Sequence, residues 1–334
     1  MKHYYVDTDI AAAGDGTSWV LAKATLATAV ALLPSNLTTD DAYTIHCKGV
    51  AADTTQVSLS GRTTDATHYI QIQVDQADRH AGVYSETNYR LIVSNSTALE
   101  ILDDHIRIDG LQIGKSSSSA NAQYGIYIGV IGAGSRIDIS NTIVKQAGND
   151  SYTEPGITIA DADAVVNIWN CVVYGLGDIS AAANSALYVS SGTVTVYSST
   201  LSGGYRGLAN SSGTVVAKNC YASANSGAYY GTITKTTCAS SDTTGSTGLQ
   251  SVAKDADTFV SVIAGSEDFH LAADGNSPLK WTGTDTTGDS APFNFTTDID
   301  GETRGAIWDV GADGWGESSY PVTVSDLADD MNAL

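Results

Sequence analysis

Proline, charged residues and long apolar runs are all scarce in this sequence. Its 334 residues include 5 prolines, and charged residues make up 16%, well below the usual quarter. No run of about 18 apolar residues occurs, so we expect no membrane-spanning helix. Alanine, serine, threonine and glycine fill the gap. This composition is typical of many short strands joined by tight turns and unlike that of a helical protein.

Positive charge is also scarce, with 16 lysines and arginines against 37 acidic residues and a formal net charge of −21. Such a chain repels nucleic-acid phosphates and anionic lipid surfaces, so neither nucleic acid nor a membrane is an expected partner. The six histidines are scattered along the sequence without metal-ligand spacing. We therefore expect no metal site and no cofactor.

The central part of the chain repeats itself. Five eight-residue segments align, and their first residues are Ile106, Ile137, Val166, Val194 and Val215, spaced 31, 29, 28 and 21 residues apart. Within each segment the apolar residues occupy positions one, three, six and eight, which indicates two short strands separated by a change of phase. One repeat then forms one coil, and the sequence predicts an all-β fold, a right-handed parallel β-helix.

The fifth position of each segment is expected to bend the chain. It is held in turn by Gly110, Asn141, Asn170, Ser198 and Asn219, and most of these residue types tolerate left-handed backbone or bond their own main chain. Stacked on successive coils, the asparagines would form a hydrogen-bonded ladder. The alternative is a meander of ordinary hairpins, but only Asp109-Gly110 carries a two-residue hairpin signal.

The four cysteines do not require a disulfide framework in a chain of this length. Cys171 and Cys220 fall in the same inward column two coils apart, at roughly 9.6 Å for a strand spacing of about 4.8 Å. A disulfide needs Cα atoms within about 7 Å. We expect buried thiols.

The two ends of the solenoid need protection from edge-to-edge association. Trp19, Ala22, Leu26, Ala29 and Leu33 recur at helical spacing, and Thr17 or Ser18 can cap the helix. This predicts an amphipathic helix that closes the first coil. A helix on a membrane surface is disfavoured because the segment carries a single lysine.

The chain is accordingly divided into four parts. Residues 1–35 form an N-terminal strand and capping helix, 36–265 the coils, 266–316 a closing segment, and 317–334 a tail that is expected to dock onto other proteins of a particle.

Motifs at both ends resemble those of a known superfamily. Tyr5-Val6-Asp7 and Gly14-Asp15-Gly16-Thr17-Ser18-Trp19 open the chain, and Asp268-Phe269-His270-Leu271, Ser277-Pro278-Leu279, Asp298–Arg304 and Asp309–Asp313 lie near its end. Together they resemble the pectate-lyase-like β-helix superfamily, closest in character to its phage virion-associated members. The resemblance implies the architecture and leaves the activity open, because lyases, adhesins and particle proteins share these ends.

The run Asp298-Ile299-Asp300-Gly301-Glu302 invites comparison with a calcium loop. An EF-hand requires glycine at the sixth position and a bidentate glutamate at the twelfth, where this chain has Thr303 and Asp309. We expect a turn instead, in which Arg304 pairs with a carboxylate.

Enzymes of this superfamily place polar residues outward on neighbouring coils. Its lyases use a basic side chain or tyrosine to remove a proton, and its hydrolases use paired carboxylates. The best outward set here lies on two coils and comprises Asp103, Asp104, His105, Arg107, Asp109, Asp138 and Lys145. If the chain is an enzyme, Arg107, Asp138, Lys145 and Asp104 are the candidate catalytic residues. A surface ion pair between Arg107 and Asp138 is the plainer interpretation.

Two further groups of polar and aromatic residues are candidates for a site. Asp150, Tyr152 and Glu154 follow in a connection and are more typical of a solvated loop. Trp169, Tyr197 and Lys218 occupy matching outward positions on successive coils and suit a glycan or a subunit contact. Burial under a loop or a subunit is the favoured interpretation of these three.

Met1–Val6 leads straight into polar sequence without the pattern of a secretory leader, so we expect either that a leader was removed or that the protein reaches its place of action by another route, as phage proteins do by lysis. The compact size, the acidic low-complexity surface and a C-terminal tail suited to docking favour the second. We therefore expect a structural protein of a phage virion, a head decoration or tail-spike-like homotrimer that stabilises the particle or contacts a surface glycan. The alternative is a secreted polysaccharide lyase or glycoside hydrolase acting on acidic glycans, its leader removed. A bacterial surface adhesin is disfavoured by the lack of an anchor or a long repeat array.

Overall fold

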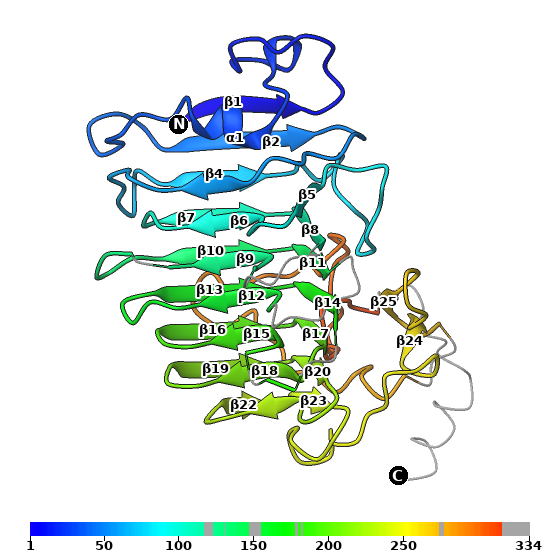
Figure 1. Ribbon diagram of the computed structural model, residues 1–334. Coiled ribbons are helices and arrows are strands. Elements are labelled where there is room, and N and C mark those ends of the chain that lie inside the picture. Colours follow the sequence, from blue (N-terminus) through cyan, green and yellow to red (C-terminus); the bar gives the residue numbers. More distant parts are fainter. Residues whose placement is uncertain are drawn as a thin grey trace.

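A computed structural model describes residues 1–116, 123–129, 131–146, 155–177, 180–181, 183–273 and 277–315. The chain winds into a parallel β-helix, as the repeat predicts (Figure 1). Three long parallel sheets run the length of the stack, and no helix among the described residues is long and apolar enough to cross a membrane.

Sheet A contains the first strand of each predicted pair. Its strands, in spatial order, are β1 (Lys2–Asp7), β2 (Tyr43–Lys48), β4 (Ile70–Gln73), β7 (Ile106–Asp109), β10 (Ile137–Ser140), β13 (Val165–Trp169), β16 (Thr193–Tyr197), β19 (Thr214–Lys218) and β22 (Thr234–Thr236).

Sheet B contains the second strand of each pair, and sheet C closes the coil. Sheet B runs from β5 (Leu91–Ser94) through β8 (Gln112–Ser116), β11 (Ile143–Gln146), β14 (Val172–Leu176), β17 (Thr200–Gly203) and β20 (Tyr221–Ser223) to β23 (Ala239–Ser240). Sheet C runs from β3 (Val57–Leu59) through β6 (Leu99–Ile101), β9 (Ile126–Ile128), β12 (Ile157–Ile159), β15 (Ser185–Val189) and β18 (Arg206–Asn210) to β21 (Tyr229–Tyr230).

The predicted register is confirmed. Ile106 pairs with Ile137, Ile137 with Val166, Val166 with Val194, and Val194 with Val215, so the five segments lie on consecutive layers. Inward side chains such as those of Ile137 and Ile139 are fully buried in one continuous core. Burial of an apolar column from every coil is what stabilises a solenoid whose single coils could not fold alone.

The bends between sheets A and B are confirmed as left-handed. The angle φ is 47° at Asn141, 50° at Asn170, 43° at Ser198 and 55° at Asn219. The ladder is shorter than expected: Asn170 donates to Asn141 Oδ1 at 3.3 Å, but the buried Ser198 hydroxyl has no hydrogen-bond partner. Serine is too short to reach the next coil, so the ladder ends there. All four cysteines are buried and free.

The predicted helix over residues 19–33 is wrong as a single element. The segment forms a 3₁₀ turn, η1 (Trp19–Leu21), and a five-residue helix, α1 (Leu26–Val30), capped by Thr25. Between them Lys23 donates to Tyr5 O at 2.8 Å and accepts from Asp7 N at 2.9 Å. An open strand edge needs partners for its peptide groups, so residues near Lys23 are drawn into pairing with β1 and cannot be helical.

The chain after the last coil folds back along the side of the solenoid. It contains the antiparallel pair β24 (Phe259–Ser261) and β25 (Asp268–Leu271), and Figure 1 shows the orange part that follows beside the coils. Phe259 packs on Tyr221 and Phe269 on Tyr174, with ring centroids 5.0 and 5.2 Å apart. These contacts form a second core that covers the outward face of sheet B. The tail beyond Trp315 lies outside the described residues.

Candidate functional site

A groove runs over the outward face of sheet A. Since side chains alternate along a strand, Gln71, Arg107, Asp138 and Asn167 form one outward column on four successive coils. Two adjoining hollows lie along the groove, with volumes of about 450 and 240 Å³. Both are lined by Arg107, Arg136 and Asp138. A site of this size suits a small ligand or a few units of a polymer.

Asp138 organises the charge in the groove. Arg136 Nε lies 2.9 and 3.0 Å from its two carboxylate oxygens, and Arg107 Nε lies 3.9 Å away. Asn167 Nδ2 donates to the same carboxylate at 2.7 Å. The Asp138 side chain is 8% exposed, whereas those of Arg107 and Arg136 are 41% and 42% exposed. Two guanidinium groups thus share one carboxylate and leave one positive charge facing solvent.

The smaller hollow holds an aromatic ring and a histidine. The Arg107 guanidinium lies 3.6 Å from the ring centroid of Tyr69, which fixes its orientation. His105 lines the same hollow with φ at 51°, and its buried Nδ1 has no hydrogen-bond partner. A non-glycine residue with positive φ at a pocket costs about 1–3 kcal/mol and is typical of functional sites.

Sequence reasoning found Arg107, Asp138 and His105 in this groove but missed Arg136 and Tyr69. Both missed residues lie immediately before a strand, outside the aligned segments. A usable signal exists for Arg136, because it lies two positions before Asp138 and alternation along a strand places both side chains on the same face.

The four candidate catalytic residues do not form one site. Lys145 lies beyond the bend at Asn141, in sheet B, with Nζ 3.9 Å from Glu267 Oε2. Asp104 lies in the turn before β7, where Oδ1 accepts from Gly132 N at 2.6 Å. The structure brings only Arg107 and Asp138 together. The loop candidates Asp150, Tyr152 and Glu154 lie outside the described residues.

Trp169, Tyr197 and Lys218 are covered by the chain itself. Phe293 lies 6.0 Å from Trp169 and 4.2 Å from Tyr197 between ring centroids, and Lys218 Nζ lies 2.7 Å from Asp289 Oδ2. These contacts agree with burial under a loop. Only Trp169 also lines the groove, where Ala291 and Pro292 form the opposite wall.

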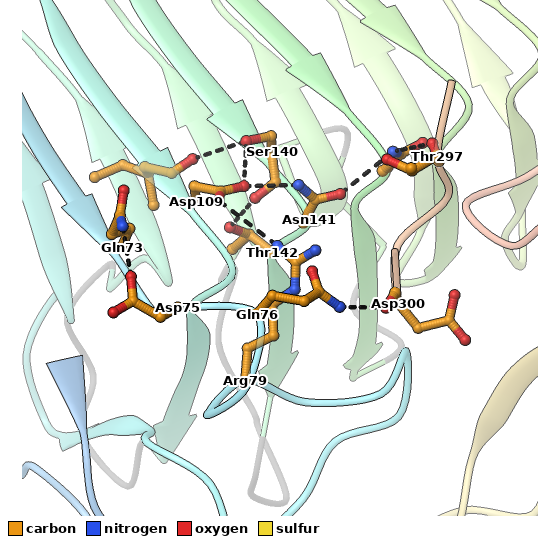
Figure 2. Close-up of polar contacts among 12 residues, drawn as sticks. Gln73, Asp75, Gln76, Arg79, Asp109, Ser140, Asn141, Thr142, Thr297 and Asp300 are labelled. Carbon is orange, nitrogen blue, oxygen red and sulfur yellow. Dashed lines mark hydrogen bonds and ion pairs between the residues drawn. The ribbon is translucent and has the colours of Figure 1, made fainter. Parts of the chain in front are cut away.

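Figure 2 shows how the groove meets the C-terminal segment. Asp109 accepts hydrogen bonds from Ser140 Oγ at 2.7 Å and from Asn141 Nδ2 at 2.6 Å. Gln76 Nε2 reaches across to Asp300 O at 2.6 Å. Asn170 Nδ2 likewise donates to Thr297 O at 2.8 Å. These two bonds, from Gln76 and Asn170, hold the returning segment beside the groove.

A second polar cluster fastens the returning segment. His270 Nδ1 lies 2.7 Å from Asp268 Oδ1, and Nε2 lies 3.3 Å from Asp300 Oδ2. Burial lowers the pKa of His270, but hydrogen bonds to Asp268 and Asp300 outweigh burial and raise the pKa to about 11. His270, Asp300 and Asp313 offer ligand atoms within 4.8 Å of one another, close enough to hold a metal ion; with no metal bound, the protonated imidazole pairs with the carboxylates of Asp268 and Asp300. The cluster is a charged clamp.

The hydrogen-bond partners of Arg304 are not the carboxylate that the sequence predicts. Its guanidinium donates to main-chain oxygens of Gly311, Ala312 and Asp313 and to Asn170 Oδ1, at 2.7–3.3 Å. Asp298 instead accepts from the main chain of Glu302 and Gly314. Among the described residues no carboxylate forms an ion pair with Arg304, and the expected pairing is replaced by bonds to carbonyl oxygens.

Comparison with known proteins adds little. No protein family and no curated protein matches the chain. Among solved structures, pectate lyase Pel9A is similar over 93% of this chain and 96% of its own, at 13% sequence identity and a TM-score of 0.33. The fold assignment therefore depends on the strand register above.

Proposed function

We propose that the chain binds an acidic glycan in the groove of sheet A, as a structural component of a phage particle that contacts a surface. The observation that carries the proposal is the pair of half-exposed guanidinium groups, Arg107 and Arg136, over a chain with a net charge of −21. Guanidinium groups bind carboxylates with two parallel hydrogen bonds.

The free cysteines support assembly into a phage particle inside the host cell. Disulfides form in oxidising compartments, and this fold holds four free buried cysteines and does not depend on oxidation. Such a chain can fold and assemble in a reducing cytoplasm, where a phage particle is built. Antibody labelling of particles released by lysis, viewed by electron microscopy, tests this setting.

The binding test compares charge variants in the groove. Acidic oligosaccharides such as oligogalacturonate or oligoalginate are titrated against the protein by calorimetry, with dextran as the neutral control. Because a charged hydrogen bond contributes about 1.5–3 kcal/mol, Arg107→Gln and Arg136→Gln should each weaken Kd about tenfold to hundredfold. Arg90→Gln, outside the groove, should leave Kd unchanged. Equal affinity in all three variants would overturn the proposal.

A lyase is the second candidate, favoured by the presence of a histidine, His105, beside Arg107 in the lining of the smaller hollow. A base that removes the proton alpha to a carboxylate neutralised by arginine would start β-elimination. The same oligosaccharides are monitored for absorbance of an unsaturated uronate and for new reducing ends. An increase in absorbance and reducing ends that is lost in His105→Gln, while binding is retained, would support a lyase. Binding without such an increase would support a structural protein.

A further inference from the structure

A histidine and two aspartates from separate parts of the returning segment meet beside the solenoid. His270 lies on β25, Asp300 lies in a turn, and Asp313 lies near the end of the described chain. Each offers one ligand atom within 4.8 Å of those of the other two. Among the described residues, this is the one group of three or more such side chains that comes so close.

The imidazole of His270 is held in the way that metal-binding histidines are held. Its Nδ1 lies 2.7 Å from Asp268 Oδ1, and the same oxygen accepts from the His270 main chain at 3.0 Å. A histidine that binds a metal through one ring nitrogen commonly donates from the other to a carboxylate, which fixes the ring and makes the ligand nitrogen more basic. This arrangement leaves Nε2 directed at Asp300.

The contacts at Nε2 fit a single ion. Nε2 lies 3.3 Å from Asp300 Oδ2, a contact that is poorly aligned for a hydrogen bond. Two ligand atoms bound tetrahedrally at about 2.0–2.2 Å from a zinc ion lie about 3.3–3.6 Å apart. The other oxygen, Asp300 Oδ1, is buried without a hydrogen-bond partner. Gly82 leaves space beside the imidazole, since a Cβ there would lie 2.4 Å from Nε2.

The cluster is rich in carboxyl groups and poor in cations. Asp268, Asp300 and Asp313 face a single imidazole. The nearby Arg304 guanidinium donates to main-chain oxygens instead. Buried carboxylates are normally paired with cations or bound to metals, so a divalent cation would supply the charge that the side chains lack.

We propose that His270, Asp300 and Asp313 bind one zinc-like divalent cation, while Asp268 orients the imidazole. One nitrogen and two carboxylate ligands suit Zn²⁺ or a similar first-row ion, whereas Ca²⁺ and Mg²⁺ prefer oxygen ligands alone. The His270 and Asp300 side chains are 25% and 16% exposed, which gives the ion a path to the site.

On binding, the ion takes the place of the proton on His270 Nε2, and that proton leaves to solvent. The charged clamp is the metal-free form of the same site. The sequence predicted no metal because the ligands lie far apart along the chain and have no common spacing. The site does not depend on glycan binding, so Arg107→Gln should leave its metal affinity unchanged.

Metal titration of matched variants tests the site. Protein freed of metal by a chelator is titrated with Zn²⁺ by calorimetry, in excess Mg²⁺ that occupies carboxylates of the acidic surface. We expect one Zn²⁺ per chain with a Kd of about 1 μM or tighter. Asp300→Asn and His270→Gln should each raise Kd at least about a hundredfold, and Asp268→Asn about tenfold to a hundredfold. His68→Gln, which removes a surface histidine paired with Asp65, should leave Kd unchanged.

Two further measurements separate metal binding from misfolding. Circular dichroism shows that each variant is folded, and Co²⁺ in place of Zn²⁺ should give the intense visible absorption of a tetrahedral site. Zn²⁺ at about 100 times its Kd should favour the folded state about a hundredfold in urea unfolding of the native chain, but not of Asp300→Asn. Absence of a one-to-one Zn²⁺ complex, an unchanged Kd in Asp300→Asn and His270→Gln, or displacement of Zn²⁺ by equimolar Ca²⁺ would overturn the proposal.

Discussion

At the residue scale, two properties of the residues at the bends between sheets A and B can be separated. One is the left-handed backbone that every bend requires, and the other is the set of hydrogen bonds that an asparagine side chain makes there. Asn170 and Ser198 have nearly the same φ, 50° and 43°. Asn170 also donates to Asn141 and to Thr297 O and accepts from Arg304, whereas the Ser198 hydroxyl has no partner. The sequence predicted the bend at both residues. It could not predict the Thr297 and Arg304 contacts, because these come from far along the chain.

Substitution by glycine should therefore have opposite effects at these two residues. Glycine removes the left-handed strain of about 1–2 kcal/mol and costs about 0.5–1 kcal/mol in chain entropy. Ser198→Gly also removes an unsatisfied hydroxyl, so we expect a gain of about 1 kcal/mol. Asn170→Gly leaves buried partners unsatisfied, so we expect a loss of about 2 kcal/mol. Urea unfolding measures both, and a loss at both residues would contradict this account.

At the element scale, regular repetition was predictable and contacts between non-repeating elements were not. The strands of the aligned segments follow from alternation and phase, which are local. The helix over residues 19–33 was wrong because its apolar spacing is compatible with burial in other ways: Ala22, Leu26, Ala29 and Leu33 are all buried without forming one helix. The requirement of β1 for a partner on its open edge decided the conformation.

The clamp that holds the returning segment should make its attachment sensitive to alkaline pH. The folded-state pKa of His270 is about 11, above its ordinary value of 6.5, so its contribution is full below about pH 6.5 and is lost as pH rises toward 11. Burial and Asp300 raise the pKa of Asp298 to about 9, and burial raises that of Asp313 to about 6. Ionisation of Asp298 adds to the loss up to about pH 9, whereas the loss from Asp313 is nearly complete by about pH 7.

We expect the equilibrium constant for attachment of the returning segment to the solenoid to fall at least tenfold between pH 7 and pH 10. Four of the five tryptophans, Trp169, Trp281, Trp308 and Trp315, lie on or against the segment, so the urea midpoint of tryptophan fluorescence reports its release. His270→Gln should flatten the dependence. His68→Gln, which removes a surface pair with Asp65, should not. A native midpoint that is constant over this range would contradict the clamp.

At the scale of the whole molecule, the three sheets have three different surroundings. The groove lies on sheet A, the returning segment covers sheet B, and tyrosines remain outward on sheet C. The solenoid itself was predictable because every coil repeats the same pattern. The position of the returning segment was not: Thr284 binds Asn219 across 65 residues, and such a single distant contact has no periodic signal. The wall of the groove on sheet A could therefore be predicted from the sequence. The opposite wall, which belongs to the returning segment, could not.

The solenoid core should make the whole molecule indifferent to redox conditions. Cys47, Cys171, Cys220 and Cys238 are at most 1% exposed, so a thiol reagent cannot reach them. Burial also raises the pKa of Cys171 to about 12, which removes its reactive thiolate at pH 8. Burial raises the pKa of Cys238 too, but hydrogen bonds from its neighbours give a net lowering, so this thiol is protected by its inaccessibility alone. We expect no reaction of the native protein with a thiol reagent and four thiols after denaturation. The urea midpoint should be the same with and without reductant. Loss of a native disulfide would instead cost about 2–5 kcal/mol.

A count of two thiols after denaturation would contradict this prediction and would mean that a disulfide is present. Cys220 and Cys238, on neighbouring coils, would be the pair. The argument that the fold is suited to a reducing cytoplasm would then no longer hold.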